Sequence, residues 1–183
     1  MPRAPDPALP GRILKAAEGL WQSGGDAEVT IRGVAAAAST TTPTVYSYFA
    51  DRNALLTALR DRALERFLGV MMKSTSLEDC CARYLEFGER HGQDYELLFG
   101  KGWFARVAPE KRTMEVGVFA ATLVKAGVNE KQAMDTAYAI LMMLHGAVMH
   151  RISNDRASPL SRKVRAACLA ACTTLLRQAS EPA

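Results

Sequence analysis

The fold of this chain is decided by residues 30–56, which read TIRGVAAAASTTTPTVYSYFADRNALL. In this stretch Ile31, Val34, Ala35 and Ala38 recur at i, i+3, i+4 and i+7, the spacing of one apolar face on a short helix. Residues 38–40, Ala-Ser-Thr, are then expected to form a tight turn, and a second short helix follows it. Directly behind this helix an aspartate caps the start of a third one. The pattern predicts a helix-turn-helix.

The second short helix has an apolar inner side and a polar outer side. Thr41 is its expected N-cap, and Val45 and Phe49, one turn apart, are expected to point inward. The outer side carries small and aromatic polar residues without charge, which suits a helix that enters the major groove of DNA. We expect DNA contacts from nine residues of this region: Arg32, Thr41, Thr42, Pro43, Thr44, Tyr46, Ser47, Tyr48 and Arg52. For Tyr48, packing inside the three-helix N-terminal head is an equal alternative.

These positions carry a resemblance to a known family. The chain resembles the TetR family of bacterial transcriptional regulators, whose pattern runs T-[IV]-x-x-[IV]-A-x-x-A-G-[VI]-S, then x-x-T-[LV]-Y-x-[YH]-F, then a polar cap before [AE]-L-L. The matching residues are Thr30, Val34, Ala35, Thr44, Val45, Tyr46, Tyr48, Phe49, Leu55 and Leu56, with Ile13, Ala17, Leu20 and Trp21 supplying the preceding helix. The rest of the chain resembles the family only in the number and length of its helices.

Two positions depart from the family pattern. Ser39 replaces the usual turn glycine, so a residue with a side chain is expected at positive φ, which is uncommon. Gly33 stands where an acidic residue often completes the capping box that begins at Thr30, so that helix start is expected to be weaker.

The resemblance implies a function and roles for particular residues. The Thr44 hydroxyl and the Tyr46 phenol would hold phosphates, while Pro43 and Ser47 would approach base edges. The implied protein is a homodimeric repressor on a palindromic operator of double-stranded DNA, released by a small, largely apolar ligand. The alternatives are a DNA-binding protein without effector and, as a more distant one, a helical enzyme. The sequence shows no glycine-rich phosphate loop, nucleophile elbow or metal-binding signature, so we expect no enzyme, no cofactor and no metal.

Composition and charge limit the classes of protein to which this chain can belong. The 183 residues are 49% hydrophobic and 23% charged, as in ordinary globular proteins. No apolar signal-peptide segment opens the chain, and the longest uncharged run is too short for a bilayer, so a cytoplasmic protein without membrane contact is expected. The net charge is +4. Residues 1–62 are nearly neutral, with six acidic residues and seven basic ones, namely Arg3, Arg12, Lys15, Arg32, Arg52, Arg60 and Arg62.

The remaining pattern is helical to the end of the chain, which predicts an all-α protein. Beyond the three head helices, further helices are expected at 52–72, 77–91, 95–99, 109–127, 130–153 and 159–178, about nine in total. We therefore predict a helix-turn-helix DNA-binding domain at 1–50, with a flexible arm at 1–9. A larger helical domain for effector binding and dimerisation follows at 51–183.

The last two helices predict a subunit interface. Residues 136–150 and 166–176 contain no charged residue on any side. A helix that is apolar all round must be buried on more than one face, and a body of this size offers only one core. We expect these helices to form a homodimer as a four-helix bundle. A central helix buried within one subunit is the alternative, and it explains one of them but hardly both.

Aromatic and methionine residues of the body suggest a pocket for apolar ligands, since thioether side chains repack easily. The candidates are Tyr84, Phe87, Phe99, Trp103, Phe104, Met114, Phe119, Tyr138, Met142 and His145. Ordinary core packing is the alternative for each of them. The pair His145-Gly146 resembles one found in a group of TetR C-terminal domains. Cys80, Cys81, Cys168 and Cys172 are read as small hydrophobic fillers, with a redox sensor as the alternative.

Overall fold

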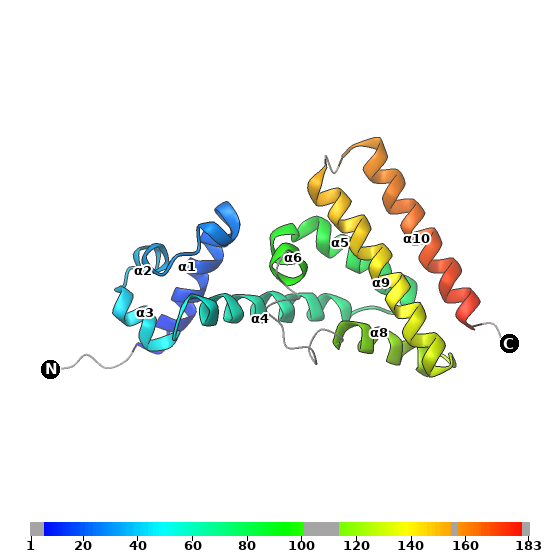
Figure 1. Cartoon of the computed structure of the whole chain (residues 1–183), viewed down its shortest axis with the longest axis horizontal. Coiled ribbons are helices and arrows are strands. Elements are labelled where there is room, and N and C mark those ends of the chain that lie inside the picture. The colour runs from blue at the N-terminus through cyan, green and yellow to red at the C-terminus, as the bar shows by residue number, and fades with distance from the viewer. Residues whose placement is uncertain (1–5, 101–113, 155–156, 181–183) are drawn as a thin grey trace. The chain divides into compact units, whose positions relative to one another are not determined.

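The computed structural model describes residues 6–100, 114–154 and 157–180 (Figure 1). Over these ranges the chain forms nine α-helices and one 3₁₀ turn, with no strand, which confirms the predicted all-α class. The chain divides into two compact units, Met1–Arg66 and Phe67–Ala183. The domain boundary at residue 50 stays a prediction.

The first unit is a small helical head. Its elements are α1 (Leu9–Gly24), the 3₁₀ turn Gly25–Ala27, α2 (Ile31–Ala37), α3 (Thr42–Tyr48) and the first part of α4 (Arg52–Met71). Apolar side chains from all four helices meet in its core, and those buried are Leu9, Ile13, Ala17, Val29, Val34, Ala35, Ala38, Val45, Leu55, Leu56, Leu59 and Ala63. One ion pair, Arg66 to Glu18 at 2.9 Å, ties α4 to α1 on the outside.

Side-chain caps start the head helices where the sequence predicts them. The Thr30 hydroxyl accepts the Gly33 amide at 3.0 Å, and the Asp51 carboxylate accepts the Ala54 amide at 2.7 Å. A Cβ on Gly33 would stand 2.9 Å from the Thr30 hydroxyl oxygen, tighter than ordinary contact. The glycine that departs from the family's capping box therefore leaves room for the Thr30 cap.

The turn between α2 and α3 depends on the left-handed backbone of Ser39. Its φ is 53°, which confirms the expectation from the missing glycine. The amides of Ser39 and Thr40 donate to the carbonyls of Ala36 and Ala35 at 3.1 and 2.9 Å, so the end of α2 is closed by two backbone hydrogen bonds. This closure turns the chain into α3. It requires Ser39 to adopt a left-handed backbone conformation, which glycine adopts without penalty.

Replacing Ser39 with glycine should therefore stabilise the protein. We expect the free energy of unfolding in urea to rise by about 0.5–1 kcal/mol. Glycine removes the cost of the left-handed conformation, and part of this gain is lost because glycine makes the unfolded chain more flexible. The matched variant Ser39→Ala keeps the penalty and should show no gain. Equal stability of the two variants would contradict this account of the turn.

The second unit begins with the last residues of α4 and holds five further helices. These are α5 (Leu77–Arg90), α6 (Gly92–Phe99), α8 (Met114–Lys125), α9 (Glu130–Ser153) and α10 (Pro159–Ser180). Four of them match predicted helices over the described residues, whereas the start predicted at 109 lies outside those residues. The sixth helix begins three residues before the predicted start at 95, because the amide of Tyr95 already donates to the carbonyl of His91 at 2.8 Å.

Close contacts fix α5, α9 and α10 against one another, and Figure 1 shows α9 and α10 side by side. At the crossing of α5 and α9, a Cβ on Gly88 would stand 2.3 Å from Val148 Cγ1, so only glycine fits there. Next to it Glu89 Oε1 lies 3.0 Å from Arg151 Nε and 3.1 Å from Arg165 Nε. This carboxylate joins the three helices, since the two arginines belong to α9 and α10.

The described helices include none that is both long enough and apolar enough to span a bilayer.

Candidate nucleic-acid interface

The helix α3 is held in shape by its own hydroxyl groups. Thr41 caps it, accepting the Thr44 amide at 3.3 Å, and the hydroxyl oxygens of Thr41 and Thr44 lie 2.8 Å apart. Ser47 donates its hydroxyl to the Thr44 carbonyl at 2.7 Å. Pro43 lies in the first turn, where its fixed φ favours the helix and no amide hydrogen is needed. A helix of two turns is thereby ordered without burying much surface.

One side of α3 faces the head and the other faces solvent. Val45 is fully buried, while Phe49, also predicted to point inward, is half-buried. On the outer side Tyr46 is 53% and Tyr48 38% exposed, large values for aromatic residues. Of the remaining predicted contacts on this helix, Thr41, Pro43 and Ser47 are exposed, and Thr42 and Thr44 are half-buried.

The outer side of α3 offers hydrogen bonds rather than charge. Residues 41–49 include no aspartate, glutamate, lysine, arginine or histidine. Hydroxyls and the amides of a helix N-terminus are common ligands of phosphate oxygens, and hydroxyls also bond base edges. A surface of this chemistry can approach DNA with few ion pairs.

The two predicted arginines have different surroundings. Arg32 is exposed on α2. Arg52, at the start of α4, donates its Nε to the Val29 carbonyl at 2.7 Å, and its Nη2 lies 3.2 Å from the Asp26 carboxylate. Arg52 thus joins α4 to the connection between α1 and α2, a contact that the sequence did not predict. Its role toward phosphate stays a prediction.

In the second unit, four of the predicted ligand residues meet in one aromatic cluster. Tyr84, Phe87 and Phe99 surround the ring of Phe67, with centroids 5.6, 5.2 and 5.5 Å away. His145 joins the cluster at its edge, 6.4 Å from Phe99. These residues come from α4, α5, α6 and α9, so the cluster lies where four helices meet.

A chain of hydrogen bonds passes through this cluster. Tyr95, fully buried, has its hydroxyl 3.0 Å from that of Tyr84 and 2.7 Å from Nδ1 of His145. Burial lowers the pKa of His145, so the ring favours its neutral form. Phe99 was among the predicted residues and Tyr95 was not, although the two are one turn apart on α6 and their rings touch, with centroids 4.7 Å apart.

The other predicted ligand residues are dispersed. Phe119 is buried in α8, whereas Tyr138 and Met142 are 42% and 56% exposed on α9. Trp103 and Phe104 lie outside the described residues. Met114 begins α8, but its side chain also lies outside what is described.

Three of the four free cysteines come together between α5 and α10. The Cys172 thiol shares hydrogen bonds with Cys81 and Cys168. The sequence could indicate only the contact with Cys168, because Cys168 and Cys172 lie one turn apart on the same helix. Burial raises the pKa of Cys80, and it raises that of Cys168 to about 12. The hydrogen bond from Cys81 lowers the pKa of Cys172. Among the described residues, no group of three or more His, Cys, Asp or Glu could hold a metal ion.

Comparisons with known proteins give a sequence match in the N-terminal part of the chain and a common fold for the chain. Residues 13–59 match the family of bacterial regulatory proteins, tetR family. A transcriptional regulator from Rhodococcus sp. Rha1 has the same fold, with a TM-score of 0.72 at 18% identity over 95% of this chain and 99% of that one. So does a TetR-like transcriptional regulator from Rhodococcus sp. RHA1, with a TM-score of 0.68 at 18% identity over 96% and 97%.

A third solved structure is a single-substitution variant of TetR from Acinetobacter baumannii AYE in complex with minocycline. It matches with a TM-score of 0.65 at 19% identity over 92% of this chain and 94% of that one. No curated protein matches this sequence. Identities this low show the fold alone, whereas the match at residues 13–59 is one of sequence and covers most of α1, all of α2 and α3, and the start of α4. Residues 13–59 thus carry the sequence of the tetR family of bacterial regulatory proteins, and the chain has the fold of TetR-like regulators.

Proposed function

We propose that this protein is a homodimeric transcriptional repressor that a small, largely apolar ligand releases from a palindromic operator. The observation that carries the proposal is the outer side of α3, a capped helix that exposes hydroxyls and tyrosines without charge. Under this proposal the chain is a regulator and not an enzyme. It acts where the bacterial chromosome lies, in the cytoplasm.

The DNA contacts follow from the residues of α3 and its surroundings. Thr44 and Tyr46 hold phosphates, and Pro43 and Ser47 approach base edges, the proline against a thymine methyl. The further contacts that we propose come from Arg32, Thr41, Thr42, Tyr48 and Arg52. Because Ser47 already donates its hydrogen to the Thr44 carbonyl, its oxygen is best placed to accept from a base amino group.

A second copy of the chain is proposed to bind through α9 and α10. On α9 the exposed residues Met134, Tyr138 and Met142 follow one another at i, i+4 and i+8, and the exposed Gly146 continues the same stripe. On α10 the exposed positions around Ala170 are also small and uncharged. An apolar stripe of this kind marks an interaction surface, and small residues let helices approach closely.

Release of the operator requires that the ligand act on the head. The helix α4 is continuous from Arg52, directly behind α3, to Met71 in the second unit. A ligand that shifts this helix would spread the two heads, so that both no longer fit the grooves of one operator. A coupling free energy of about 1–3 kcal/mol is typical of such regulation.

The salt dependence of operator binding tests the uncharged character of the interface. On a duplex selected from random DNA, we expect the slope of log K against log salt to be only about −2 to −4 per dimer, because the slope counts phosphates neutralised by cations. The measurement is fluorescence anisotropy across a series of KCl concentrations. A slope of about −7 or steeper, equal to eight or more ion pairs, would contradict the proposed contacts.

A further inference from the structure

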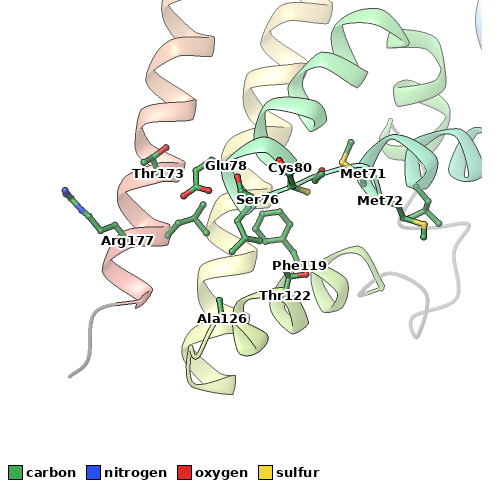
Figure 2. A pocket seen from close by; sticks show the side chains of 15 residues that line it. Met71, Met72, Ser76, Glu78, Cys80, Phe119, Thr122, Ala126, Thr173 and Arg177 are labelled. Atoms are coloured by element: carbon green, nitrogen blue, oxygen red, sulfur yellow. The ribbon is translucent and has the colours of Figure 1, made fainter.

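A pocket of about 860 Å³ lies in the second unit, apart from the aromatic cluster. It is lined by the end of α4, the start of α5, the helix α8 and the C-terminal half of α10 (Figure 2). Of the predicted ligand-binding residues whose side chains the structure describes, Phe119 alone lines it. Its volume falls within the usual range of small-molecule sites in proteins.

The wall of the pocket is mainly apolar. Met71, Leu77, Phe119 and Leu176 contribute side chains from four different helices, and Figure 2 shows the Phe119 ring between Ser76 and Thr122. Thioether and aromatic groups of this kind accept varied apolar skeletons. Hydroxyls at the edge add hydrogen-bonding groups without charge.

The charges at the pocket are placed asymmetrically. Among the lining residues that the structure describes, two carry a full charge at neutral pH, Glu78 and Arg177. Figure 2 shows the Arg177 side chain reaching away from the cavity, whereas the Glu78 carboxylate lies between Thr173 and Ser76, above the apolar wall. A negative charge thus faces the ligand side and the positive one does not. This arrangement favours a cation over an anion.

We propose that this pocket binds a lipophilic monocation and is the effector site of the regulator. The ligand class is inferred from the apolar lining of the pocket and from the charge of Glu78. The regulatory role also depends on the function proposed above. An occupied pocket contacts Leu68 and Met71 in the last turn of α4, the helix that begins behind α3. The ligand would therefore act directly on the element that leads to the head.

Two ions of the same shape and opposite charge test the ligand class. Calorimetric titration of the full chain with tetraphenylphosphonium should give one equivalent per chain, bound about tenfold or more tightly than tetraphenylborate. The Glu78→Gln variant should weaken tetraphenylphosphonium binding about two- to fivefold, an effect that salt diminishes because Glu78 is exposed. Equal or tighter binding of tetraphenylborate overturns the assignment of a cation.

A cavity-filling variant tests the location. Thr122→Trp introduces an indole at an exposed lining position and should weaken tetraphenylphosphonium binding about tenfold or more. The matched variant Ala121→Trp, exposed on the same helix but outside the lining, should bind as the native protein does. Ala126→Phe fills the pocket from the end of α8 and repeats the test if Thr122→Trp does not fold. Unchanged binding in a folded filling variant overturns the site.

The regulatory role has a separate readout. Saturating tetraphenylphosphonium should weaken operator binding about fivefold or more in the native protein and have no such effect in Thr122→Trp. If the ion binds at the pocket but leaves operator affinity unchanged, the effector role is refuted while the binding site stands. If the protein selects no operator at all, the proposed function fails, and the titrations still decide the site.

Discussion

Replacing Tyr46 with alanine should abolish operator binding while the dimer stays intact. Its phenol is proposed to hold a phosphate, and a hydrogen bond to a charged group contributes about 1.5–3 kcal/mol. Each operator binds two copies of the residue, so the affinity should fall about 10²- to 10⁴-fold. The side chain is 53% exposed, and its loss should therefore leave the thermal stability of the head nearly unchanged. Fluorescence anisotropy with the selected operator measures the effect.

The Tyr46→Phe variant separates the hydroxyl from the ring. It keeps the ring and removes only the phosphate ligand, so we expect it to lose nearly as much affinity as Tyr46→Ala. Full affinity in Tyr46→Phe would mean that the ring alone acts, by packing. Full affinity in Tyr46→Ala would overturn the assignment of α3 as the helix that contacts DNA.

Replacing Met142 with glutamate should convert the dimer to a monomer. The side chain is 56% exposed on the uncharged stripe of α9, and two-fold symmetry would bury a carboxylate of each copy at the same interface. Because a buried, unpaired charge costs several kcal/mol, we expect the dissociation constant of the dimer to rise about a hundredfold or more. Sedimentation velocity over a range of protein concentrations measures it.

A matched substitution controls for the charge itself. Met72 is 85% exposed and follows α4 rather than lying on α9. Met72→Glu adds the same charge and should leave the protein dimeric. A dimer of unchanged affinity in Met142→Glu, or a native protein that is already a monomer at micromolar concentration, would contradict the proposed interface.

The head could be predicted from sequence almost residue by residue. Its helices are short, and their limits are set by local chemistry: Thr30, Thr41 and Asp51 each cap the helix that follows them. The positive φ of Ser39 was also predictable, because the turn demands that backbone whichever residue occupies it. The contacts of Arg52 with Val29 and Asp26 were not, since they join segments far apart in the sequence.

In the body the sequence predicted helices but not their neighbours. Periodicity places Tyr84 and His145 on helices, yet it cannot show that Tyr95 connects them by two hydrogen bonds. It likewise cannot show that Cys81 meets Cys172, because that contact depends on how α5 packs against α10. A pocket between helices is a property of the packing as a whole, which is why Phe119 alone among its described lining residues was predicted.

The most direct test of the account is chemical protection of the selected operator. Dimethyl sulfate methylates guanine N7 in the major groove and adenine N3 in the minor groove. If paired subunits each place α3 in a major groove, N7 should be protected in two symmetric half-sites with centres about 34–36 Å apart, or a multiple of that distance. Adenine N3 should stay reactive. Reactive N7 throughout the operator, or one unsymmetrical patch of protection, would contradict the account.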